Sequence, residues 1–325
     1  MTAPRTSLTL LVSSAGRRVE LLQAFRAAAQ DLGIALKVFA SDLDPDMSAA
    51  CRLADARFAV PRADSADYIP AMLAACEQHG IDLVVPTIDT ELEALSEAVD
   101  RFAAIGTRIA VSAPDFVAMA RDKAKTAEAL AAAGLPTPRT ASLAGVRADP
   151  AGWTFPVMVK PNHGSAGRSI SVAQSPADLP TVEPEPLIVQ ELLVGAEYTI
   201  NMFFDAAGTA RCVIPHRRIR TRAGEVEKGV TERRTDLCTI GWQLAERFEG
   251  VRGTICFQAI VTERGPFVFE INARFGGGYP LAHEAGAQCA KWLLEEVAGL
   301  PSTAHDGWEE GVTMLRYDAA VFHRA

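Results

Sequence analysis

The chain has 325 residues, a formal net charge of −8 and interleaved acidic and basic residues, which excludes nucleic acid or an anionic membrane as its main partner. Its six cysteines form no C-x-x-C pair and lack zinc spacing, so we expect reduced thiols. No apolar run reaches the roughly 18 residues of a membrane helix, and the run at 8–12 is too short for a signal peptide, so we expect a cytoplasmic protein that acts on small molecules.

Residues 8–112 predict a parallel α/β unit. Apolar strands are expected at 8–12, 35–40, 81–86 and 108–112. Helices are expected between them, at 19–32, 68–79 and 91–103. Ligands approach such units at the carboxyl ends of the strands.

Polar residues follow those strand ends. Arg17 lies in the segment after the first strand, and Asp89 and Glu91 follow the strand at 81–86, which makes these three candidates for substrate binding. The two acids are equally well explained as helix N-terminal residues that face the dipole. A nicotinamide site is disfavoured because residues 13–18 lack the later glycines of G-x-G-x-x-G.

A domain boundary is predicted near residue 134. A long helix over 115–133 ends at Gly134, and Pro136 and Pro138 follow as a rigid connection. Beyond it the pattern predicts strands joined by turns, at 157–160, 169–173, 187–191, 198–204, 212–215, 256–262 and 267–271. The second part is therefore expected to be α+β.

Two segments of this second part suit phosphate chemistry. Lys160 ends an apolar strand and precedes a small-residue loop at 162–168, whose backbone N–H groups can approach phosphate oxygens. Glu270, Asn272 and Arg274 alternate along another strand and therefore share one face. An acid, an amide and a guanidinium on one face suit Mg²⁺ beside an anionic reactant.

Residues 215–229 concentrate positive charge. Arg220 and Lys228 are the preferred members if this run forms a wall that binds a phosphate or a carboxylate. A solvated charged face explains the run equally well.

In this order, the segments resemble the ATP-grasp superfamily, and most closely one synthetase half of the carbamoyl phosphate synthase large chain. Asp122-Lys123, the turn Gly134-Leu-Pro-Thr-Pro138, the strand lysine, the glycine loop, the segment 190–198 and the strand 268–274 carry the resemblance. It implies a pre-ATP-grasp α/β domain at 1–114, an ATP-grasp subdomain with its linker helix and phosphate loop at 115–186, and a second α+β subdomain with the adenine hinge and metal strand at 187–325.

The resemblance also implies roles for individual residues. ATP would be bound by Lys123, Lys160, Gly164, Ser165, Gly167, Glu191, Leu193 and Glu197. One or two Mg²⁺ ions, for which Mn²⁺ can substitute, would be held by Gln258, Glu270 and Asn272, although Gln258 is uncharged where many members carry an acid. Arg274, with Lys228 and Arg220, would stabilise the transferred phosphoryl group, and Gly277 joins Arg17, Asp89 and Glu91 as a substrate candidate.

The activity that the resemblance implies is ligation of a carboxylate to an amine, or to ammonia or a thiol, through an acyl phosphate with release of ADP. Two alternatives stay open: a carboxyphosphate-forming subunit that uses bicarbonate, and a nucleotide-binding module without turnover. A homodimer is compatible with either. The substrate acid and the nucleophile are not predicted.

Overall fold

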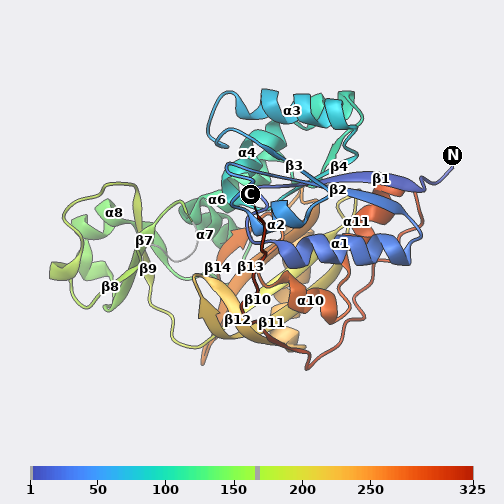
Figure 1. Ribbon diagram of the computed structural model, residues 1–325. Coiled ribbons are helices and arrows are strands. Elements are labelled where there is room, and N and C mark those ends of the chain that lie inside the picture. Colours follow the sequence, from blue (N-terminus) through green and yellow to red (C-terminus); the bar gives the residue numbers. More distant parts are fainter. Residues whose placement is uncertain (1–2, 165–168, 325) are drawn as a thin grey trace.

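The structure of the chain is a computed structural model that describes residues 3–164 and 169–324. Within these ranges the chain forms three β-sheets (Figure 1). The first is parallel and the other two are antiparallel, which confirms the expected α/β unit followed by α+β subdomains.

The N-terminal sheet has the order β3-β2-β1-β4-β5. Its strands are β1 (Ser7–Ser13), β2 (Ala35–Asp42), β3 (Ala56–Ala59), β4 (Leu83–Pro86) and β5 (Arg108–Ile109). The helices that follow them are α1 (Val19–Asp31), α2 (Ala49–Leu53), α3 (Tyr68–His79), α4 (Asp89–Glu97) and α5 (Val99–Ala104). The chain reverses its direction across the sheet between β1 and β4, so the segments that leave these two strands diverge and open a crevice.

Two expected helices are each divided. The helix expected at 91–103 is α4 and α5, which meet at Ala98. The helix expected at 115–133 is α6 (Pro114–Arg121) and α7 (Lys123–Ala132). Asp122 separates them because its backbone is extended, with φ −102° and ψ 110°, and its carboxylate caps α7 by accepting a hydrogen bond from the N–H of Lys125. The break makes Lys123 the first residue of a helix.

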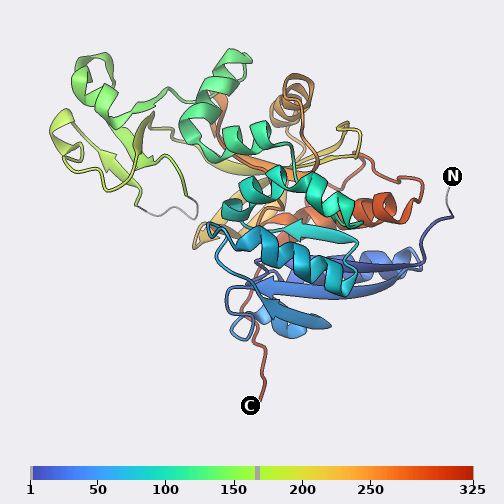
Figure 2. The same ribbon diagram turned by 90° about the horizontal axis from the view of Figure 1, so that it is seen from above.

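The second sheet, of order β6-β9-β7-β8, forms a lobe at one side of the molecule (Figures 1 and 2). It contains β6 (Thr140–Ser142), β7 (Val157–Pro161), β8 (Ser171–Ala173) and β9 (Leu187–Glu191), with α8 (Leu143–Ala148) and single turns at Pro150–Gly152 and Pro176–Asp178. We call residues 140–191 the lobe. It has a small apolar core of its own, which includes Leu143, Val157 and Val189.

The third sheet has the order β14-β13-β10-β11-β12-β15. Its strands are β10 (Ala196–Phe204), β11 (Ala210–Arg222), β12 (Glu225–Thr231), β13 (Gly253–Thr262), β14 (Gly265–Asn272) and β15 (Thr313–Leu315), with helices α9 (Thr235–Arg247), α10 (Tyr279–Glu284) and α11 (Cys289–Ala298). Gln258 lies opposite Glu270 and Ala259 opposite Val268, which leaves Phe269 as an extra residue in β14. This β-bulge lets Val268 face the core while Glu270, two residues on, lines a cavity.

The first and third sheets are packed together through shared apolar cores. One core joins Leu11 and Leu95 to Ile200 and Val268, and another joins Leu10 and Phe25 to Phe203 and Trp292. All six cysteines are free, and five of them are buried, as expected for reduced thiols. Among the described residues, no helix combines the length and the apolar character needed to cross a membrane.

Candidate active site

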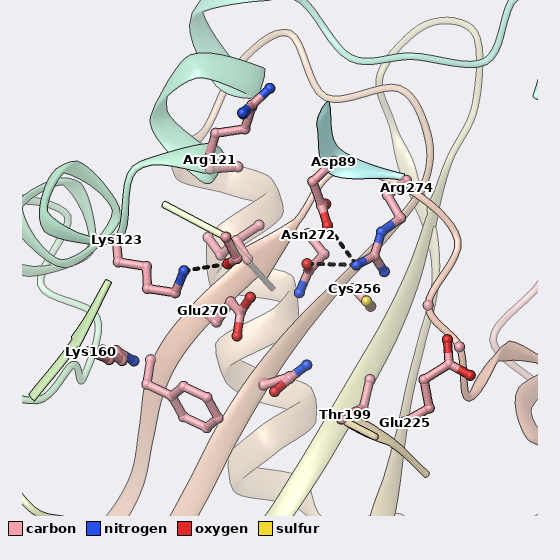
Figure 3. A pocket seen from close by; sticks show the side chains of 18 of the residues that line it. Asp89, Arg121, Lys123, Lys160, Thr199, Glu225, Cys256, Glu270, Asn272 and Arg274 are labelled. Atoms are coloured by element: carbon pink, nitrogen blue, oxygen red, sulfur yellow. Dashed lines mark hydrogen bonds and ion pairs between the residues drawn. The ribbon is translucent and has the colours of Figure 1, made fainter. Parts of the chain in front are cut away.

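One large cavity of about 1070 Å³ lies where the three sheets meet. Its lining includes the segments that follow β1 and β4, the start of α7, the end of β7, the hinge after β9 and the exposed faces of β13 and β14. Figure 3 shows the spatial order of its polar side chains, from Lys160 and Lys123 past Glu270 and Asn272 to Arg274. The cavity therefore gathers residues that are far apart in the chain.

Two lysines line one end of the cavity. Lys160, on β7, is only 4% exposed, and its Nζ lies 5.2 Å from the centre of the Phe269 ring. Burial lowers the pKa of Lys160 from its ordinary 10.5 to about 8, since desolvation disfavours the charged amine; Glu270 opposes this shift and Lys123 adds to it. Lys123 is buried as well, and its Nζ donates a hydrogen bond of 2.7 Å to the carbonyl oxygen of Gly164.

Arg274 is fixed by three oxygen atoms, one of which is the carbonyl oxygen of Phe275, 3.2 Å from its Nη1. Its Nη2 donates to Asp89 Oδ2 at 2.9 Å and to Asn272 Oδ1 at 2.9 Å. Asp89 comes from the N-terminal sheet's side of the cavity, so this ion pair links the two halves of the site. Because Nε of Arg274 is buried without a partner among the described residues, the guanidinium retains a donor for a ligand.

The donor atoms fit one Mg²⁺ better than two. Glu270 makes no hydrogen bond or ion pair with any described residue, so its carboxylate is available. Asn272 Oδ1 accepts from Arg274 but keeps a second lone pair, and Nδ2 of Asn272 is buried without a described partner. No three His, Cys, Asp or Glu side chains converge within the described ranges, so phosphate oxygens and waters would have to complete the coordination, as Mg²⁺ sites usually require.

Gln258, the other expected metal ligand, has a different partner in the structure. Its Oε1 accepts a hydrogen bond of 2.9 Å from Nη1 of Arg218, and the same nitrogen lies 2.5 Å from Oε1 of Glu197. Arg218 is 5% exposed in its side chain. A guanidinium beside Gln258 opposes a second cation there by like-charge repulsion.

The expected adenine hinge borders the same cavity. Glu191, Leu193 and Glu197 all line it. The Glu191 carboxylate ion-pairs with Arg264. Burial raises the pKa of Glu197, while Arg218 acts in the opposite direction.

Six further expectations concern the expected phosphate loop and the substrate candidates. Arg17, Asp89, Gly164 and Gly277 line the cavity. Ser165 and Gly167 lie outside the described residues.

Three expected site residues do not reach the cavity. Arg220 pairs with Glu227 at 2.9 Å and is 66% exposed in its side chain, and Lys228 is exposed on β12. Glu91 is fully buried, with the four donors Tyr68 Oη, Ser14 Oγ and the N–H groups of Thr87 and Ile88 at 2.7 to 3.1 Å. Glu91 therefore fixes the segments that carry Arg17 and Asp89 and does not contact a ligand itself.

The sequence did not single out several residues that line the cavity, among them Arg18, Arg218, Glu225 and Cys256. Arg18 is next to the substrate candidate Arg17. Arg218 and Glu225 lie in the basic run at 215–229, where nothing in the sequence distinguishes them from their neighbours. Cys256 precedes Gln258 by two residues on the same strand and so shares its face, which was a usable signal.

The comparisons with known proteins agree with this geometry. Residues 10–110 match a model described as PylC-like, N-terminal domain, and residues 120–278 match one described as ATP-grasp domain. No curated protein sequence matches the chain. The chain thus carries an ATP-grasp domain behind a PylC-like N-terminal domain, which confirms the superfamily; the particular likeness to carbamoyl phosphate synthase stays a prediction.

Several solved structures have the same fold at low sequence identity. A biotin carboxylase–beta-gamma-ATP complex from Campylobacter jejuni has a TM-score of 0.72 at 17% identity, over 90% of this chain and 72% of that one. The biotin carboxylase domain dimer of Hydrogenobacter thermophilus 2-oxoglutarate carboxylase, with MgADP and bicarbonate, has a TM-score of 0.75 at 15% identity, over 95% and 73%. N5-carboxyaminoimidazole synthetase from Staphylococcus aureus has a TM-score of 0.70 at 15% identity, over 94% and 81%.

Proposed function

We propose that this chain, whose residues 120–278 match the ATP-grasp domain, is an ATP-dependent ligase that phosphorylates a carboxylate and joins the resulting acyl phosphate to an amine, with release of ADP. The ATP-grasp domain itself implies ATP-dependent ligase activity. The observation that carries the finer proposal is the order of charges in one cavity: two buried lysines, then a free carboxylate, then a buried guanidinium. Phosphoryl transfer from ATP is promoted by cations that hold the phosphates and by a metal ion that neutralises the developing charge, which this arrangement can supply.

The lysines are suited to the phosphates. Lys160 and Lys123 present cations from a rigid strand and from a helix start, so neither has to be ordered when a nucleotide binds. The buried surroundings of Lys160 strengthen its attraction to phosphate oxygens.

Glu270 and Asn272 would hold Mg²⁺ beside these lysines. The ion, when bound, neutralises charge on the transferring phosphoryl group. Glu270 provides the free carboxylate and Asn272 an amide oxygen, while Gln258 is better placed to hold Arg218.

Arg274 is the residue that we assign to the reacting acid. Asp89 and Asn272 fix its orientation, so its remaining donors can be aimed at the acyl phosphate without reorganisation. Leu193 and Glu191 would pair with adenine through their backbone, and Glu197 would accept the ribose hydroxyls with the oxygen that Arg218 leaves free.

The test is a screen of carboxylic acids with MgATP and hydroxylamine as a substitute for the unknown amine. We expect the correct acid to yield a hydroxamate and ADP, and ¹⁸O in that acid to appear in inorganic phosphate. Glu270→Gln should reduce ADP release by at least about 100-fold, since it removes the only free carboxylate at the metal position.

The outcomes separate the alternatives. Release of AMP and pyrophosphate would show adenylation and contradict the proposal. ADP release with bicarbonate alone would favour the carboxyphosphate-forming activity, and nucleotide binding without turnover on any acid would favour a binding module. ADP binding without metal serves as the control that Glu270→Gln leaves adenine recognition intact.

A further inference from the structure

A second group of charges lies at the end of the cavity remote from the lysines. In Figure 3, Glu225 lies beyond Cys256, on the side opposite to Glu270. Glu225 Oε1 is 3.2 Å from Nη1 of Arg18, and its Oε2 is 3.2 Å from Nη1 of Arg316. We call Arg18, Glu225 and Arg316 the distal cluster. Its two arginines come from opposite ends of the chain, and each is 19% exposed in its side chain.

The distal cluster has an excess of positive charge. Arg274 is matched by Asp89, whereas the single carboxylate of Glu225 faces two guanidinium groups. A charge that is largely removed from water is costly unless an opposite charge accompanies it. The pKa of Arg18 reflects this strain, since burial lowers it and the nearby Arg274 and Arg316 act in the same direction, against Glu225.

The two arginines of the cluster have different surroundings. Arg316 does not line the cavity: its Nη2 donates to the carbonyl oxygen of Gly277 at 2.7 Å, and its backbone N–H donates to Glu227 at 2.9 Å. It therefore fixes Glu225 and the glycine run from behind. Arg18 does line the cavity and makes a single 3.2 Å contact with Glu225, so it keeps donors for a ligand.

The turn that presents Arg18 is rigid. Ser14 adopts φ +49° and donates through Oγ to the buried Glu91 at 2.9 Å, and the N–H of Gly16 donates to Asp42 at 2.8 Å. The N–H of Arg18 then closes the turn on the carbonyl oxygen of Ala15 at 2.8 Å. A guanidinium fixed in this way loses little conformational entropy when an anion binds.

We propose that Arg18 binds a second anionic group of the substrate, distinct from the carboxylate that is phosphorylated near Arg274. The substrate class is then an acid with a further carboxylate or phosphate, and Arg316 is a positioning residue that holds Glu225 and Gly277 in place. This inference rests on the proposed ligase function, because it divides the same cavity into a reacting end and an anchoring end.

The experiment measures acid binding to the MgADP complex by thermal shift and calorimetry. The probes are succinate, glutarate and adipate, each compared with the monocarboxylate of equal chain length (butyrate, valerate and hexanoate), and phosphonoacetate tests a phosphonate against a carboxylate. We expect at least one dianion to bind wild type roughly tenfold or more tightly than its monoanionic counterpart, the amount that one charge-assisted hydrogen bond supplies.

Three variants identify the cause. Arg18→Gln should abolish the preference for dianions and leave the affinity for MgADP unchanged. Glu225→Gln should keep or tighten dianion binding, since it removes the carboxylate that competes for Arg18. Arg222→Gln is the control. It removes an exposed arginine that pairs with Asp318, which lies on the same C-terminal segment as Arg316, and it should change neither the preference for dianions nor the affinity for MgADP.

Several results would overturn the inference. Equal binding of dianions and monoanions to wild type, or an unchanged preference in Arg18→Gln, excludes the subsite. If Glu225→Gln lowers the melting temperature and also weakens dianion binding, the cluster is an interdomain ion pair only. Failure of the ligase proposal is separate, because it appears as no ADP release with any acid while dianion binding still depends on Arg18.

Discussion

In the proposed ligase, Lys160 is the residue whose protonation should matter most for nucleotide binding. Its amine is buried beside Lys123 and Glu270, and its pKa is about 8. Near neutral pH the amine is charged in most molecules, but the margin is small. Binding to phosphate should therefore depend on pH in a range where an ordinary lysine would not titrate.

We predict that affinity for ADP is constant below pH 8 and decreases as the pH rises through 8, by up to about tenfold per pH unit. Phosphate oxygens favour the charged amine, so the pKa of Lys160 is higher in the complex than in the free protein. The favourable contribution is thus fully present below the free pKa and is lost above it. Calorimetry in two buffers of different ionisation enthalpy should detect uptake of up to one proton near pH 9.

Lys160→Met is the matched control for this prediction. It should bind ADP weakly at every pH and show no proton uptake, while its melting temperature without nucleotide stays equal or rises, because a buried amine has been replaced by an apolar side chain of similar length. If the ADP affinity of Lys160→Met keeps the wild-type pH dependence, a group other than Lys160 is responsible for the titration.

Alternation along strands led to residues that line the cavity. Glu270 and Asn272 lie two residues apart on β14 and both line it, and Arg274 lines it from just beyond the end of the strand. The basic run could not be resolved in the same way. Arg218 and Arg220 would share a face of a regular strand, but the register shifts between them, so Arg218 enters the cavity and Arg220 pairs with Glu227. A single sequence contains no signal for that shift.

At the scale of elements, the ends of helices were predictable where glycine marks them. Gly33 and Gly80, with φ +66° and +60°, follow α1 and α3 as expected. Apolar periodicity did not predict the break at Asp122, because it continues across it; only the resemblance of Asp122-Lys123 to a helix start pointed to it. Three hydrogen bonds explain why a new helix begins there. The Asp122 carboxylate accepts from the N–H of Lys125, while the carbonyl oxygen and the side-chain oxygen of Asn162 accept from the N–H groups of Lys123 and Ala124, respectively.

The glycine run at 276–278 packs closely against the third sheet. A Cβ on Gly278 would lie 2.7 Å from Nε2 of His216 and 2.7 Å from Val226. His216 is fully buried, and burial lowers its pKa to about 3, so it is a neutral side chain held within the sheet. It cannot move aside as an exposed side chain would.

We predict that Gly278→Ala destabilises the protein by about 1–3 kcal/mol, the usual cost of overpacking a buried contact. The midpoint of thermal unfolding measures this, and it should fall by a few degrees. Gly307→Ala is the control, since its Cβ would meet only the exposed His305 ring, at 3.2 Å, and no buried side chain. Equal effects of the two substitutions would contradict the packing argument.

At the scale of the whole molecule, the apolar cores divide the chain differently from the expected ranges 1–114, 115–186 and 187–325. The N-terminal sheet and the third sheet share two cores, so residues 1–114 lack a core of their own. The lobe is the part with a separate core, and that core is small. Linear sequence cannot reveal this, because residues that pack together, such as Leu11 and Val268, lie far apart in it.

Separate cores predict separate unfolding. The lobe contributes Lys160 and Glu191, at the start of the hinge, to one wall of the cavity, and the remaining sheets contribute Glu270 and Arg274 to the other. A nucleotide that contacts both walls should therefore stabilise the lobe by attaching it to the larger unit.

We predict that hydrogen–deuterium exchange will give a lower opening free energy for backbone amides of β7 and β9 than for those of β1, β10 and β13. The difference should be at least about 2 kcal/mol, because the lobe has far less buried apolar surface to lose. At one hundred times its Kd, MgADP should raise the opening free energy of the lobe by about 2.7 kcal/mol through mass action. Lys160→Met should lose most of this protection, whereas Arg18→Gln, at the far end of the cavity, should retain it. If the lobe and the other two sheets exchange identically without nucleotide, the three sheets unfold as one unit. If MgADP protects only β1 and β10, the nucleotide binds without contacting β7.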